Sequence, residues 1–143
     1  MSTRVNQIEN LQQIEAIVAG PDGATRLYTI AGRLGDGVNR LLGAGEGRPG
    51  FDTFTCLIGP TFTRQQFVRA IASAWVTTTK FSLVVQPTLN LALGIKEVDA
   101  DWDDESGRVE LRIEVFVQIG EPTSVADINS LGFQVTILAA VAP

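Results

Sequence analysis

The stretch "RVELRIEVFVQI", from Arg108 to Ile119, carries the clearest structural signal in this chain. Every second residue in it is apolar: Val109, Leu111, Ile113, Val115, Val117 and Ile119. Side chains of a strand point alternately to its two faces, so this period of two predicts a strand with one buried face. The residues between them begin with Arg108, Glu110, Arg112 and Glu114, which we expect on an outer face in contact with water.

Three other segments are typical of strands. "FDTFTCLI" (51–58) is rich in β-branched and aromatic residues and ends at Gly59-Pro60. A second apolar alternation runs from Phe81 to Ile95, and Pro87 within it marks an edge position or a break. A last alternating run, 133–139, predicts a strand close to the end of the sequence.

Helical spacing is found in the first part of the chain. An apolar set with steps of three to four residues comprises Val5, Ile8, Leu11, Ile14, Ile17 and Val18. This spacing predicts a helix that ends at "GPDG" (20–23). A similar stripe from Leu27 to Leu42 predicts a second helix, or two short ones, because three glycines in it each cost roughly 1 kcal/mol relative to alanine.

Two more helices are expected further along. Thr63 and Gln66 have the spacing of a capping box, in which each side chain caps a backbone N–H of the other. The helix behind it would bury Phe67, Ala70, Ile71, Ala74 and Trp75. Ser124 to Leu131 is typical of a short helix. Together, these segments predict an α+β protein with a helical N-terminal arm (1–45) and a core (46–143) of order β-α-β-β-α-β, a ferredoxin-like antiparallel sheet with helices on one face.

Composition narrows the classes of function. The chain has 143 residues, 45% of them hydrophobic, a net charge of −5 and only two lysines, so a basic surface for nucleic acid is not expected. No apolar run approaches the roughly 18 residues of a membrane span, and the start "MSTRVNQIEN" lacks the apolar stretch of a signal peptide. We therefore expect a protein made in the cytoplasm with no membrane partner.

Catalytic equipment is sparse. The chain has no histidine, which removes Ser-His and Cys-His nucleophiles and the commonest zinc ligand. Cys56, the only cysteine, alternates with Thr55 and Leu57 and is expected to be a buried, inert thiol. Gly45, Gly47 and Gly50 match G-x-G-x-x-G, but they precede a strand instead of opening a helix. We therefore expect no enzyme and no cofactor.

The acidic stretch "VDADWDDESGRVE" (98–110) allows two interpretations. Asp99, Asp101, Asp103 and Glu110 stand at positions 1, 3, 5 and 12 of a calcium loop. Such a loop needs glycine at position 6, whereas the nearest glycine comes later and the flanks are strands. This favours a hairpin whose charged tip stays in water, with calcium binding as the alternative.

Candidate interface residues come from several segments. Trp102, among aspartates, either folds back onto the sheet or marks a contact surface. Arg108 and Arg112 belong to a face that is either wet or a subunit interface, and Ile8 and Leu11 belong to the expected helical arm.

Three stretches in order resemble the small baseplate wedge, or sheath-initiator, proteins of contractile phage tails and related injection machines. These are "IENLQQIEAIVAGPDGATR", "LGDGVNRLLGA" and "FTRQQFVRAIASAW", followed by two long strands joined by an acidic turn. The resemblance covers roughly residues 5–119 and implies a helical part before an α/β core, in a protein that sits in the baseplate. The sequence departs from the family after Trp75, where "VTTTK" replaces a Glu-Pro-Arg signature.

We therefore expect a non-enzymatic structural subunit of a phage tail or tail-like particle, of baseplate, connector or terminator type, with other protein subunits as partners. The alternative is a small α+β ligand-binding or regulatory domain whose sheet and helices enclose a pocket. A third possibility, a carboxylate-based enzyme or calcium module, would act through Asp99, Asp101 and Asp103.

Overall fold

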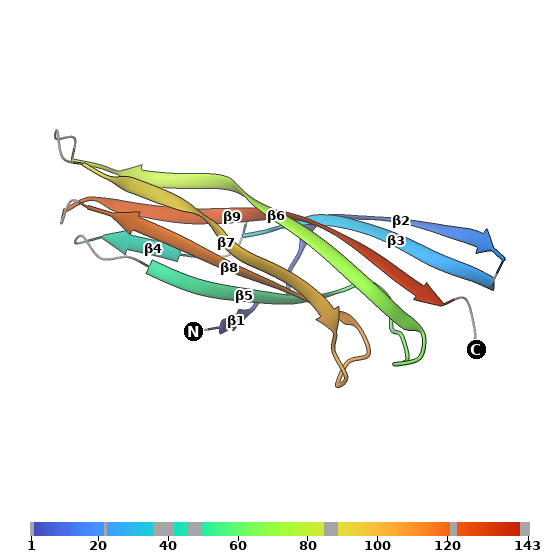
Figure 1. Cartoon of the computed structure of the whole chain (residues 1–143). Coiled ribbons are helices and arrows are strands. Elements are labelled where there is room, and N and C mark those ends of the chain that lie inside the picture. The colour runs from blue at the N-terminus through green and yellow to red at the C-terminus, as the bar shows by residue number, and fades with distance from the viewer. Residues whose placement is uncertain are drawn as a thin grey trace.

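The described part of the protein consists of strands arranged in two sheets (Figure 1). The computed structural model describes residues 2–21, 23–35, 42–45, 50–84, 89–120 and 123–140. Sheet A has the order β1-β5-β8-β7, with bounds Ser2–Arg4, Gly50–Ile58, Val109–Ile119 and Leu91–Trp102. Sheet B has the order β2-β3-β9-β6, with bounds Glu9–Gly20, Gly23–Leu34, Val125–Ala140 and Phe67–Ser82. A short strand, β4 (Leu42–Gly45), pairs with the first part of β9.

The core lies between the inner faces of the two sheets, which is the arrangement of a β-sandwich. All six apolar positions of the alternation in β8 are fully buried, from Val109 to Ile119. The facing positions of β9, including Phe133, Val135 and Ile137, are buried as completely. Two antiparallel sheets thus cover each other's apolar faces, and no helix is needed for this.

The expected α+β, ferredoxin-like fold is therefore wrong, since the described residues contain no helix. The strands expected over 51–58, 109–119 and 133–139 are confirmed as β5, β8 and the second half of β9. The alternation from Phe81 to Ile95 is divided between the end of β6 and the start of β7, and Pro87 lies outside the described residues. The short helix expected from Ser124 to Leu131 is instead the first half of β9.

The expected N-terminal helices are also strands. β2 and β3 form a hairpin, with Gly20 paired to Gly23, where the first helix was expected to end. β3 pairs with β9, and β1 pairs with β5 in parallel. The first 34 residues therefore contribute to both sheets, and the described part of residues 1–45 contains no helical arm.

The capping box forms but opens no helix. The backbone N–H of Thr63 donates to Oε1 of Gln66 at 2.9 Å, and the N–H of Gln66 donates to Oγ1 of Thr63 at 3.3 Å. Only one turn follows, and β6 begins at Phe67. Ala70, Ala72, Ala74 and Val76 then face the core in alternation, while Ile71 and Trp75 point outward.

Candidate interaction surface

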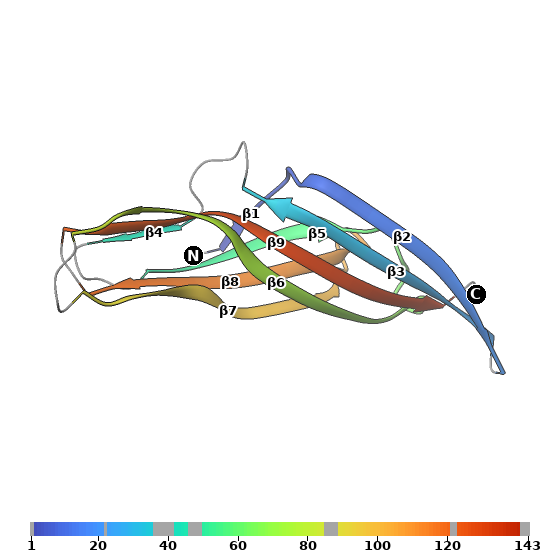
Figure 2. The same ribbon diagram turned by 90° about the horizontal axis from the view of Figure 1, so that it is seen from above.

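The most unusual part of the molecule is the β2–β3 hairpin. From Gln12↔Ala31 to Gly20↔Gly23 its pairing runs without a register shift. Figures 1 and 2 show that the hairpin projects past the end of sheet A, beyond the end of β9. Eleven of the twelve residues of β2 are exposed, so this strand contributes little to the core and is available for contacts.

We define the hairpin face as the outward side of sheet B around β2. Tyr28 and Ile30 of β3 are buried against the core, so the residues next to them in sequence point outward, together with the cross-strand partners of those residues. The outward set includes Ile14, Ala16 and Val18 of β2, Leu27, Thr29 and Ala31 of β3, Thr136 and Leu138 of β9, and Ile71 of β6. The side chain of Ile14 is 70% exposed and that of Ile71 is 60% exposed. None of these nine residues is charged, and a cluster of this size without charge is unusual for a sheet face in water. The next residue in the same alternation of β3 is the charged Arg33.

Trp75 extends this face along β6. Its indole lies directly over Gly132 of β9, where an added Cβ would collide with the ring. Because Gly132 has no side chain, the indole can pack directly on the backbone at the outward side of the sheet, and Trp75 remains 44% exposed. A large, half-exposed aromatic group of this kind is typical of contact surfaces.

The inner side of the hairpin is exposed as well, because sheet A does not reach it. Ile17 is 61% exposed, although its side chain lies on the core-facing side of sheet B. Nearby, the Tyr28 hydroxyl donates to Oε1 of Glu15 at 3.5 Å, and Nε of Arg26 lies 3.9 Å from the same oxygen. Tyr28 also packs edge-on against Phe62, with ring centroids 5.6 Å apart, where the core ends.

The outer edge of β2 is open. In the described part of the chain, β2 is paired only with β3, and its other side carries unpaired backbone groups. Natural edge strands are normally protected by lysine, proline, bulges or inward charges. β2 contains neither lysine nor proline, its only charged residues are Glu9 and Glu15, and its one irregularity precedes Gln12, next to Asn10 with φ 51°.

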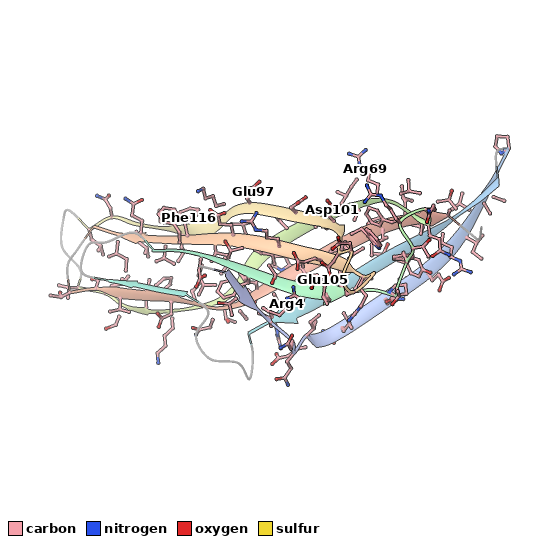
Figure 3. The ribbon with its side chains drawn as sticks, turned by 90° about the horizontal axis from the view of Figure 1, so that it is seen from below. Arg4, Arg69, Glu97, Asp101, Glu105 and Phe116 are labelled. Carbon is pink, nitrogen blue, oxygen red and sulfur yellow. The ribbon has the colours of Figure 1, made fainter. Side chains whose placement is uncertain are left out.

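The outer face of sheet A contrasts with the hairpin face. It carries cross-strand pairs of charged residues, among them Asp99↔Arg112 and Asp101↔Glu110. Nζ of Lys96 lies 3.0 Å from Oε1 of Glu114, and Figure 3 shows Glu97 and Phe116 on the side turned away from sheet B. This face is charged and exposed to solvent, as expected from the alternation of β8.

The four possible calcium ligands have other partners or lie apart. Asp103 accepts hydrogen bonds from the hydroxyl of Ser106 at 2.6 Å and from its N–H at 3.1 Å, and these lower the pKa of the Asp103 carboxyl. Glu110 pairs with Arg4 at 2.7 Å, and Asp101 accepts from the N–H of Trp102. No group of three or more potential metal ligands occurs among the described residues, including Asp99.

The expected interface residues divide into structural and exposed ones. Nε1 of Trp102 donates to the carbonyls of Phe62 at 3.0 Å and Gly107 at 3.1 Å, so this side chain folds back onto the neighbouring loop. Nε of Arg108 donates to the carbonyl of Gly59 at 2.9 Å. These two residues therefore hold the end of the sandwich together.

The other three differ in exposure. Ile8 packs onto the core, over Gly32. Leu11 and Arg112 are exposed, the first on β2 and the second on the outer face of β8. Only Leu11 thus lies on the projecting hairpin.

Cys56 is fully buried, as expected, and burial raises the pKa of its thiol to about 12.

The described surface includes one open hollow of about 280 Å³, lined by Arg64, Phe67, Asp101 and Trp102. The helices that were expected to enclose a pocket are absent from the described residues, and the space between the sheets is filled by side chains.

Comparison with known proteins found no match. No family model matches it, and neither the curated proteins nor the solved structures contain a significant match. Within the described ranges, no helix is long and apolar enough to cross a bilayer.

The sequence pattern did not reveal four residues as parts of one exposed sheet face. It placed Ile14 and Val18 on the apolar stripe of an N-terminal helix, and it placed Ile71 and Trp75 on the inner face of another helix. The available signal was the nearly uncharged run "NLQQIEAIVAG" (10–20), which carries large apolar residues at both odd and even positions.

Proposed function

We propose that this protein is a non-enzymatic structural subunit of a protein assembly, and that it contacts neighbouring subunits through the β2–β3 hairpin. One observation carries the proposal: a regular, projecting edge strand leaves Ile14, Ile17 and Val18 exposed on its two faces. A chain that worked alone in water would gain nothing from such a strand and would risk non-specific pairing.

The energetics favour contact with another protein surface. Fully burying an isoleucine or valine side chain contributes about 1.5–3 kcal/mol, so covering the exposed parts of these three residues would contribute roughly 1–2 kcal/mol each. Backbone hydrogen bonds along the open edge would add specificity. These terms must exceed the cost of association, which requires a sizeable interface and not a single side chain.

The kind of particle remains a prediction from the sequence. The resemblance to baseplate wedge proteins rested partly on "FTRQQFVRAIASAW" as a helix ending in tryptophan, whereas most of this segment is strand β6. The proposal therefore concerns assembly through the hairpin, and membership of a phage tail or tail-like particle would be one setting for it.

Sedimentation velocity on the full chain over a wide range of concentrations tests the proposal. Wild-type protein should form oligomers, and Ile14→Lys should shift the population toward monomer, because a charge would be buried in the contact. Val68→Lys is the matched control, because Val68 is 59% exposed but lies on β6, at the edge of sheet B opposite β2. A wild-type chain that stays monomeric at every concentration, and behaves as Ile14→Lys does, would refute the proposal.

A further inference from the structure

We propose that the partner of β2 is β2 of a second copy of this chain, paired antiparallel about a twofold axis at Ala16. The inference rests on the proposed function and names the occupant of the open edge. The two copies of sheet B would then join into one continuous sheet, with both hairpin faces on the same side.

The strand itself selects this register. In a continuous sheet, two directly paired residues have their side chains on the same face. Residues of one face of β2 are either all even-numbered or all odd-numbered, so the numbers of two paired residues must sum to an even number. The regular part of β2 runs from Gln12 to Gly20, and its midpoint is Ala16. Pairing about Ala16 uses this whole run and places Ile14 opposite Val18 of the second copy, on the outward face.

Charge supports the same choice. In the register centred on Ala16, Glu15 stands opposite Ile17 of the second copy and not opposite another carboxylate. A register centred on Glu15 would place two carboxylates directly opposite each other, which is destabilising. A register centred on Ile17 avoids this, but it leaves Gln12 and Gln13 without partners and so forms fewer backbone hydrogen bonds.

The other described edges fit a second copy less well. β6 carries Arg69 and Lys80, has three register shifts, and lies beside β7. β7 has a shift between Ile95 and Glu97 and an acidic outer face, and β1 is only three residues long. Among the described edges, β2 alone combines length, regular pairing and apolar side chains.

Cysteine cross-linking tests the pairing and its register. Directly opposite residues of antiparallel strands lie within the Cα separation that a disulfide needs, about 4.4–6.8 Å. Ala16→Cys should form a disulfide-linked dimer on mild oxidation. Ile14→Cys and Val18→Cys should link to each other when the two proteins are mixed. Each variant alone should remain unlinked, because the substituted residue lies about 13 Å along the strand from the same residue of the second copy.

The buried Cys56 can stay in place, since its thiol is inaccessible. Ile71→Cys is the control for random collision, because Ile71 is as exposed as the β2 residues but lies on β6. It should remain unlinked under the conditions that link Ala16→Cys.

The outcomes separate this inference from the proposed function. Oligomers that form without the Ala16 link would overturn the β2–β2 pairing while assembly stands. Linking of Ile17→Cys in place of Ala16→Cys would overturn the register. A chain that is monomeric at all concentrations would overturn both the pairing and the proposed function.

Discussion

A pair of isoleucine truncations gives the sharpest test of how residues 9–20 are used. Ile113 lies in the middle of β8 with no exposed surface, whereas Ile14 on β2 is 70% exposed. As the outer edge of a sandwich, β2 should tolerate Ile14→Ala in the isolated chain. If Ile14 instead lay on a buried helix face, its truncation would lower the unfolding free energy as much as truncation of Ile113.

The expected magnitudes follow from burial. Ile113→Ala removes buried methyl and methylene groups and leaves a cavity between tightly packed sheets, so it should lower the unfolding free energy by about 2–5 kcal/mol. Ile14 keeps only about a third of its side chain covered, and full burial contributes about 1.5–3 kcal/mol, so Ile14→Ala should cost about 0.5–1 kcal/mol.

Urea unfolding of dilute protein, followed by the fluorescence of Trp75 and Trp102, measures both values by linear extrapolation. At higher protein concentration the cost of Ile14→Ala should grow, because a contact present only in the assembled native state adds to its stability. Equal losses for the two variants in dilute solution would refute the reasoning, since Ile14 would then have to be packed inside the chain.

Two further predictions concern buried polar groups. The Cys56 thiol has a pKa of about 12 in the folded protein, above its ordinary value of 9.0, so the unfolded chain ionises first as pH rises. The stability contributed by the neutral thiol is therefore fully present below pH 9.0 and is lost toward pH 12, at up to about 1.4 kcal/mol per pH unit. Urea titrations between these pH values should show this decline for wild type and a flatter profile for Cys56→Ala, and parallel profiles would contradict it. Trp102→Phe removes the N–H that bonds to two carbonyls and should lower the unfolding free energy by about 1–3 kcal/mol, whereas unchanged stability would show that those bonds contribute nothing.

The helical predictions failed for an identifiable reason. Period-two alternation is visible only where one face of a strand is apolar and the other is polar, as in β8. In β6 the inner residues are small, namely Ala70, Ala72 and Ala74, while Ile71 and Trp75 face outward. Apolar residues on both faces produced spacings of three and four that imitate a helix.

The capping box shows the same limit of local signals. Its two hydrogen bonds form between Thr63 and Gln66, but they stabilise one turn whatever follows. The continuation as β6 depends on pairing with β9, far along the sequence, and that pairing outweighs a local preference.

The sequence by itself determined the strands with one apolar face, the buried and inert Cys56, and the charged outer face of β8, because each depends on local alternation and composition. The tertiary structure alone decided that residues 9–34 form a hairpin, that β9 is central to sheet B, and that an apolar face and an open edge are left in water. These features depend on which distant strands pair and on where sheet A ends. A strand on the outside of a sheet, with both faces exposed, has no buried side to impose a period on its residues, and its character appears only when its neighbours are in place.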